Sequence, residues 1–213
     1  MTPLAPRPLL AALLIGAALG CAPRARPLVG VEAPRALPAA QLVGAQRLQF
    51  KWSYDDGNMV GRGEGVARVV APDSARLDFF IQGGFGGGGT AFLIGDALDA
   101  PGGDFVRRLL PPPALLWASL GRLAVPAAAD TVARSDGGLL RADIGSQPVF
   151  RVTFDGAALR RVERIDGGRL QEWVARGEGG RVEYVHEASG RRLILEITSQ
   201  ERVEGFDASI WER

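Results

Sequence analysis

The chain has 213 residues, with 25 basic and 24 acidic side chains, one histidine and one cysteine. This length is enough for one domain with a substantial core, and the near balance of charge excludes strong electrostatic attraction to nucleic acid. A lone histidine excludes a histidine-rich metal site, and a lone cysteine excludes a disulfide within the chain.

The N-terminus has the layout of a bacterial lipoprotein signal peptide. An apolar run at residues 8–20 follows a start whose only charged side chain is Arg7, and Cys21 comes directly after the run. The run is shorter than the ~20 apolar residues of a membrane-spanning helix, and it has the form of a cleaved export signal. We therefore expect residues 1–20 to be removed and Cys21 to be lipidated. The alternative is an ordinary secretory signal followed by a free thiol, which would be a reactive liability in an oxidising compartment.

The segment after Cys21 predicts a tether rather than a folded element. Residues 22–40 carry four prolines and no sustained hydrophobic period, and such a segment spans at most ~60 Å when fully extended. We accordingly divide the chain into a signal peptide at residues 1–20, a lipidated cysteine and tether at residues 21–41, and one folded domain at residues 42–213.

The first half of this domain predicts an antiparallel meander. Residues 47–54 alternate between polar and apolar side chains, which is the period of a half-buried strand. A turn sequence at residues 55–58 follows. Further strand-like stretches occupy residues 60–70, 75–82 and 90–98.

The second half predicts a short helix and then more strands. After a run of three prolines, residues 114–123 place Leu116, Leu120 and Leu123 on one helical face. Six apolar stretches with glycine-containing turns between them follow at residues 139–144, 149–154, 159–165, 170–176, 181–186 and 193–198. The fold class is therefore mainly β: a curved antiparallel sheet of about 10 or 11 strands, covered by one or two short helices.

Side chains for catalysis are sparse, and we expect the protein not to be an enzyme. His186 lies on the same face of its predicted strand as Val182 and Tyr184, which favours a structural histidine over a catalytic base. The acidic residues mostly neighbour turns or arginines, as solvated charges do. The glycine-rich stretch at residues 83–90 lacks the lysine and the strand-to-helix context of a phosphate-binding loop.

Four arginines lie near predicted strand ends or turns, where they could meet an acidic partner: Arg176, Arg181, Arg191 and Arg192. A solvated arginine face is the default explanation for them. Phe85, surrounded by glycines, has two interpretations from sequence alone. It either folds back onto the core or forms an exposed apolar tip that probes a lipid surface.

A resemblance favours the lipid interpretation. Residues 65–79, the Gly84-Phe85-Gly86 triplet and residues 90–93 resemble the LolB family of outer-membrane lipoproteins, which belongs with the LolA-like lipoprotein localisation factors. In that family a protruding loop leucine follows the strand, and Phe85 matches this leucine by position, with Gly84 in place of a proline. The resemblance implies a membrane-insertion loop at Phe85, Gly84 and Gly86.

The resemblance also implies an unclosed half-barrel with a dry cavity for the acyl chains of lipoproteins or phospholipid, a LolA-like carrier as partner, and no cofactor. Residue 22, which follows the cysteine, is Ala rather than Asp. By resemblance to the sorting rule of enteric bacteria, this favours an anchor in the outer membrane, with the protein on the periplasmic face. Large apolar side chains on the predicted strands and helix are candidates for the cavity lining, although for each one taken alone plain core is the favoured interpretation: Phe50, Trp52, Phe79, Phe92, Leu116, Trp117, Leu120, Phe154, Trp173, Tyr184 and Leu195. The main alternative function is a structural lipoprotein that docks an envelope protein complex, and a hydrolase built around His186 is a third.

Overall fold

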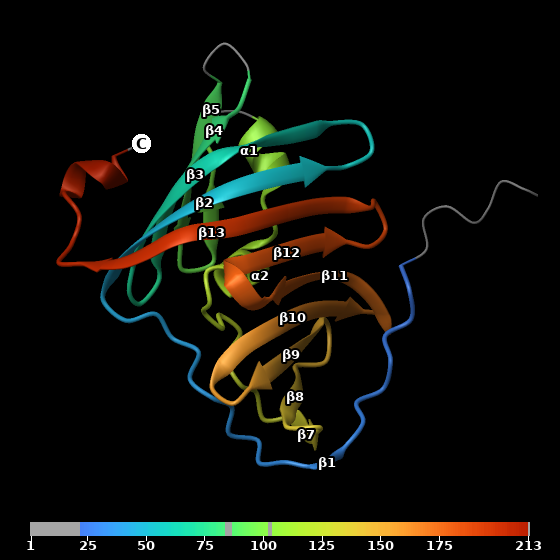
Figure 1. Ribbon diagram of the computed structural model, residues 1–213. Helices are drawn as coiled ribbons and strands as arrows, with labels where there is room; N and C mark the ends of the chain where they lie inside the picture. Colours follow the sequence, from blue (N-terminus) through green and yellow to red (C-terminus); the bar gives the residue numbers. More distant parts are fainter. Residues whose placement is uncertain (1–21, 84–86, 102–103, 213) are drawn as a thin grey trace, which may run out of the picture.

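The computed structural model describes residues 22–83, 87–101 and 104–212. Within these residues one antiparallel sheet contains all the strands (Figure 1). The strands are β1 (Val31–Glu32), β2 (Ala45–Asp55), β3 (Val60–Val70), β4 (Ser74–Ile81), β5 (Gly88–Ile94), β6 (Ala97–Asp99), β7 (Val132–Asp136), β8 (Leu139–Ile144), β9 (Val149–Asp155), β10 (Ala158–Asp166), β11 (Arg169–Arg176), β12 (Arg181–His186) and β13 (Arg191–Val203). The helices are α1 (Asp104–Leu109) and α2 (Pro113–Ser119), with short 3-10 turns at Glu178–Gly180 and Ala208–Trp211.

The sheet consists of two meanders that meet in its middle. Strands β2 to β6 form the first and β7 to β13 the second, and β13 pairs with β2 to join them. The sheet curls without closing, and its edges are β1 and β6. The predicted fold class, a curved and unclosed antiparallel half-barrel with short helices, is confirmed. The sheet of 13 strands exceeds the expected count because β1, β6 and β7 are short.

Alternating side chains determine which face of each strand is buried. In β2 every second residue from Leu48 to Tyr54 is buried and the intervening ones are exposed. Tight turns that require a left-handed backbone use glycine, as at Gly167 and Gly168, where φ is +54° and +71°. Because the period is two, the buried residues of successive strands collect on one face of the sheet.

The two helices cover this face, which we call the concave face; the opposite one is the convex face. Helix α2 begins at Pro113 and packs against β10, β11 and β12, while α1 packs against β5. Helix α2 ends earlier than the predicted helix at residues 114–123, because Gly121 adopts a left-handed conformation with φ of +95°. Among the described residues, no helix combines the length and the apolar character that a membrane crossing requires.

The segments before β2 and after β13 both contact the sheet. Residues 22–44, of which residues 22–40 were predicted to be a tether, run along the sheet from one end to the other and form hydrogen bonds with it. At the other terminus, the 3-10 turn Ala208–Trp211 folds back onto the convex face, where Arg76 Nη1 donates a 2.6 Å hydrogen bond to the carbonyl of Ile210. The folded body therefore includes nearly all of the described chain.

Candidate functional site

The concave face carries an aromatic cluster built from the first meander. Phe50 and Trp52 of β2 and Phe79 of β4 are all buried. The ring of Phe79 meets that of Phe50 edge-on at 5.5 Å and that of Trp52 at 6.1 Å. Such edge-to-face pairs contribute about 0.5–1.5 kcal/mol beyond the area they bury. Phe105 of α1 lies 6.0 Å from Trp52 and links the helix to the cluster.

Glycines of β3 make room for these rings. Gly63 and Gly65 pair directly with Trp52 and Phe50, and a Cβ atom on Gly65 would lie 2.4 Å from the Phe50 ring. Gly61 pairs with Tyr54 in the same way. The sequence contains a pattern that could have predicted this packing. Glycine occupies every second position of residues 61–65, and an aromatic residue occupies every second position of residues 50–54 on the neighbouring strand.

The structure brings nine of the eleven predicted lining residues together in the buried core beneath the helices. They are Phe50, Trp52, Phe79, Leu116, Trp117, Leu120, Phe154, Tyr184 and Leu195. The prediction is wrong for the remaining two, Phe92 and Trp173, because they lie on the convex face. Phe92 is buried beneath Arg76, whose guanidinium lies 5.5 Å from the ring centroid, and Trp173 stacks under Arg161 at 3.9 Å.

The concave interior is filled by side chains. Leu115, Leu116 and Trp117 of α2 are buried against the sheet, and Trp117 Nε1 donates a 2.6 Å hydrogen bond to the carbonyl of Gly95. Two hollows in the described part of the chain lie on the convex face over β2 and β3. Their volumes are about 230 and 220 Å³, below the ~300–1,000 Å³ of typical ligand pockets. A ligand in the interior would therefore have to displace side chains or helices.

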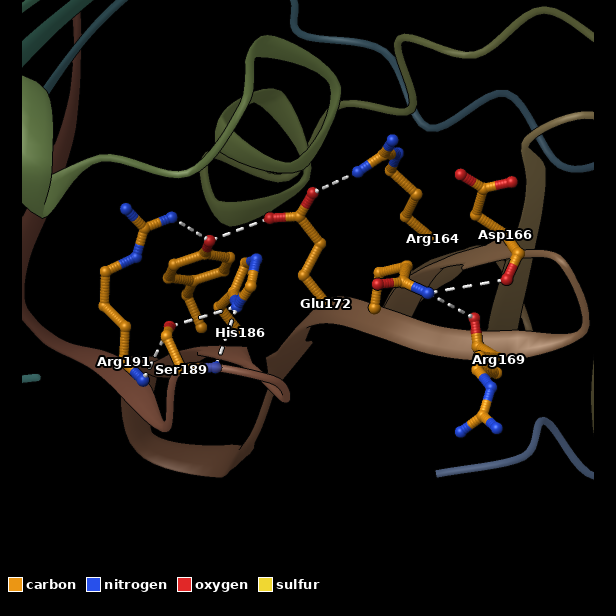
Figure 2. A network of polar contacts seen from close by, with 9 residues as sticks. Arg164, Asp166, Arg169, Glu172, His186, Ser189 and Arg191 are labelled. Carbon is orange, nitrogen blue, oxygen red and sulfur yellow. Dashed lines mark hydrogen bonds and ion pairs between the residues drawn. The ribbon is translucent and has the colours of Figure 1, made fainter. Parts of the chain in front are cut away.

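A chain of polar contacts runs through this apolar interior (Figure 2). Glu172 is only 2% exposed, accepts a 3.0 Å hydrogen bond from Arg164 Nη1, and accepts another of 2.8 Å from the Tyr184 hydroxyl. Arg191 in turn donates to the Tyr184 hydroxyl. Burial raises the pKa of Tyr184 and the Glu172 carboxylate adds to the rise, whereas the hydrogen bond from Arg191 opposes it. The expectation that acidic residues are solvated is wrong for Glu172.

Two arginines attach the helices to the sheet. Arg176, at the end of β11, donates to the carbonyl of Ser119 in α2, and Arg191 donates a 3.2 Å hydrogen bond to the carbonyl of Arg108 in α1. The sequence favoured a solvated arginine face for both, as for Arg181 and Arg192, with contact to an acidic partner as the alternative. Arg192 pairs with Glu183 at 3.1 Å and Arg181 with Glu196 at 3.9 Å, and both arginines remain partly exposed.

The remaining predicted groups add little chemistry. His186 Nδ1 lies 3.0 Å from the hydroxyl of Ser189 in the adjacent turn (Figure 2). No group of three or more His, Cys, Asp or Glu side chains that could hold a metal ion occurs in the described ranges. Cys21 and the loop residues Gly84, Phe85 and Gly86 lie outside the described residues, although the hairpin that bears the loop is closed by a 3.0 Å hydrogen bond from Ile81 to Gly87.

Comparison with solved structures identifies the architecture. A LolA superfamily protein from Nitrosomonas europaea superimposes with a TM-score of 0.52 over 84% of this chain and 99% of its own, at 10% sequence identity. This chain has a LolA-like fold. At that identity the likeness concerns the fold alone. No protein-family model and no curated protein sequence matches the chain.

Two further structures are similar at lower scores. A DUF1329 family protein from Desulfovibrio piger gives a TM-score of 0.43 at 13% identity and covers 79% of this chain and 90% of its own. A putative outer membrane lipoprotein-sorting protein domain from Vibrio parahaemolyticus gives 0.42 at 10% identity, with coverage of 79% and 89%.

Proposed function

We propose that this protein is a lipid-anchored periplasmic factor that binds acyl chains between the concave face and the two helices. In this role it accepts lipoproteins, or another lipid, from a LolA-like carrier and places them in the outer membrane. The observation that carries the proposal is the LolA-like half-barrel whose concave face gathers large apolar side chains under two short helices. Nothing in this role makes or breaks a covalent bond.

Binding requires the interior to open, and few polar bonds oppose that step. Helices α1 and α2 have six and seven residues. Side-chain bonds that tie them to the sheet or its loops include Arg191 to Arg108, Arg176 to Ser119, and Trp117 to Gly95. An acyl chain gains about 0.8 kcal/mol for each methylene that it buries, so ~15 methylenes contribute about 12 kcal/mol toward displacing the helices. The apolar side chains of the interior would then exchange contacts with each other for contacts with the chain.

The tryptophans allow this proposal to be tested, because they lie on different faces. Trp52 and Trp117 face the interior, whereas Trp173 lies on the convex face. In a soluble form that begins after Cys21, we would replace Trp173 and Trp211 with Phe and add a fatty acid brominated along its chain. Bromine quenches indole fluorescence at contact, so saturable quenching at micromolar concentration is expected.

The matched control carries Trp52→Phe and Trp117→Phe instead, which leaves only the outer indoles. Its fluorescence should not change when the brominated fatty acid is added. Equal quenching of both proteins would mean adsorption to the surface, and absence of quenching in both would mean that the interior takes no acyl chain. Either result contradicts the proposal.

The filled interior also favours a second candidate, a structural lipoprotein that uses its sheet to dock an envelope protein complex. Large exposed apolar side chains are present, including Phe80, which is 55% exposed on the convex face of β4. The others lie on several elements, among them β1, β3, β5 and β7. This candidate predicts no quenching in the tryptophan experiment and a stable protein partner instead.

A further inference from the structure

The first described residues are joined to the turn between β10 and β11. Ala22 is 6% exposed, and its carbonyl accepts a 2.8 Å hydrogen bond from Arg169 Nη1. The carbonyl of Pro23 accepts a second 2.8 Å bond from the backbone N–H of Leu170. The chain is therefore fixed to the sheet from the residue directly after Cys21.

The rest of the segment remains attached to the body until β2 begins. Val31–Glu32 forms β1 on the edge of β7. The carbonyl of Ala40 then accepts a 2.9 Å hydrogen bond from Leu123, and that of Gly44 accepts one of 2.9 Å from Ala71. We call residues 22–44 the strap. Figure 1 shows the strap passing around the lower edge of the sheet from one end to the other.

The strand register defines which turns share an end with the start of the strap. Arg192 of β13 lies opposite Asp55 of β2, so the turns at residues 187–190 and 56–59 are neighbours. The turn at residues 167–168 lies at the same end, since β11 pairs with β12. In Figure 1 these three turns point to one side of the molecule, where the strap begins. We call them the anchor end.

We infer that the anchor end rests on the headgroups of the bilayer that holds Cys21. This inference depends on the proposed lipid attachment at Cys21. A single residue spans at most ~3.6 Å, so an acylated Cys21 brings Ala22 and the turn bonded to it to the membrane surface. A free tether of ~60 Å is not compatible with a strap that is hydrogen-bonded along its length. The opposite end, with the turns at residues 137–138 and 156–157, then faces the periplasm, where a protein partner can reach it.

Paramagnetic broadening of amide signals by a gadolinium-bearing lipid tests this orientation. The isotope-labelled chain from Cys21 onward is coupled through its only thiol to a maleimide lipid in a nanodisc, so the experiment requires neither natural acylation nor a lipid cavity. The eleven residues of β2 span about 36 Å, which separates the two ends widely. Amides of Gly57, Gly168 and Ala188 should lose most of their intensity, and those of Gly138 and Gly156 should keep it.

A variant with twenty Gly and Ser residues inserted directly after Cys21 is the matched control. The insert has an average span of ~25 Å and leaves the strap intact, so the difference in broadening between the two ends should disappear. Uniform broadening of the unmodified chain, or stronger broadening at Gly138 and Gly156, would overturn the inference. The acyl-binding proposal is tested separately by tryptophan quenching in the soluble form, so the two ideas can fail independently.

Discussion

The aromatic side chains of β2 lie opposite three glycines of β3, namely Gly61, Gly63 and Gly65. Each pairs with one aromatic residue on the concave face, and the space above the backbone of Gly65 is occupied by the Phe50 ring. Protein interiors are packed closely enough that one added methyl group at such a position forces neighbours to move. The aromatic cluster and the glycine pattern therefore depend on each other.

Gly65→Ala should lower the free energy of unfolding by about 1–3 kcal/mol, the usual cost of overpacking a core. A Cβ atom there would lie 2.4 Å from the Phe50 ring and 2.8 Å from the carbonyl oxygen of Asp78. Gly61→Ala on the same strand is the control, because its Cβ atom would lie 3.3 Å from Trp52. Urea denaturation of both variants provides the comparison. Equal losses would show that the close approach at Gly65 does not matter.

Tyr54 predicts a loss of stability at alkaline pH. Burial, and next the hydrogen bond from its hydroxyl to Asp56, raise the pKa of Tyr54 from 10.0 to about 12. The folded state thus favours the neutral phenol, so this stabilisation is complete below pH 10 and disappears as the pH rises toward 12. Tyr54→Phe should lose less unfolding free energy than the unmodified protein between pH 9 and pH 11.5 in urea titrations. Parallel losses in the two proteins would exclude the role of this hydroxyl.

Single side chains are where sequence reasoning was least accurate. Alternation placed Phe50 and Trp52 on the correct face, since β2 has polar and apolar residues in strict turn. Trp173 was assigned to the interior by its size, but Val174 beside it is the core residue of β11, and Glu172 shares the inner face. A buried carboxylate has no local signature, because its partners Arg164 and Tyr184 come from neighbouring strands.

At the scale of elements, Arg176 connects the end of β11 with the end of α2. Its guanidinium donates to the carbonyl of Ser119, where the unpaired carbonyls of the last helical turn attract a positive charge. Burial lowers the pKa of Arg176, and the charge of nearby Arg160 adds to the effect. Gly121 follows the helix with φ of +95°, and a Cβ atom at this residue would contact the guanidinium.

Arg176→Met should therefore lower the free energy of unfolding by about 1.5–3 kcal/mol, the range for hydrogen bonds that involve a charged group. Arg181→Met is the control, since Arg181 forms a solvent-exposed pair with Glu196 at 3.9 Å. Such pairs contribute about 0–1 kcal/mol. Thermal unfolding followed by circular dichroism compares the two variants, and a smaller loss for Arg176→Met than for Arg181→Met would contradict the role of Arg176 at the helix end.

Long elements were predicted from sequence, and short ones were not. The apolar pattern at residues 114–123 and the longer strands of the two meanders have enough residues to show a period of 3.6 or 2. Helix α1 has six residues, and β1 and β6 have two and three, so no period develops in them. The predicted strand at residues 90–98 is in fact two strands, because Gly95 turns the chain between β5 and β6 with φ of +59°. Local pattern also cannot distinguish the strap from a free tether, since its bonds are to residues far along the chain.

At the scale of the whole molecule, composition and turn spacing predicted the fold class, but the strand order depends on one long-range pairing. Strand β13 lies beside β2, and this pair connects two meanders that would otherwise be separate sheets. The apolar cluster beneath the helices extends across the join, with Leu193 and Leu195 of β13 next to Tyr54 and Trp52. The half-barrel and its interior therefore require both meanders and the pairing of β13 with β2.

The same pairing has a consequence for how the protein matures. Strand β2 is synthesised early and β13 (Arg191–Val203) is the last strand of the described sheet in chain order. Until β13 has been synthesised, β2 exposes an unpaired edge, and the Phe50 and Trp52 side chains lack part of their cover. Contacts between residues so distant in sequence form slowly and leave the nascent chain open to aggregation. The edge of β2 is therefore the part of the nascent chain most open to aggregation until β13 pairs with it.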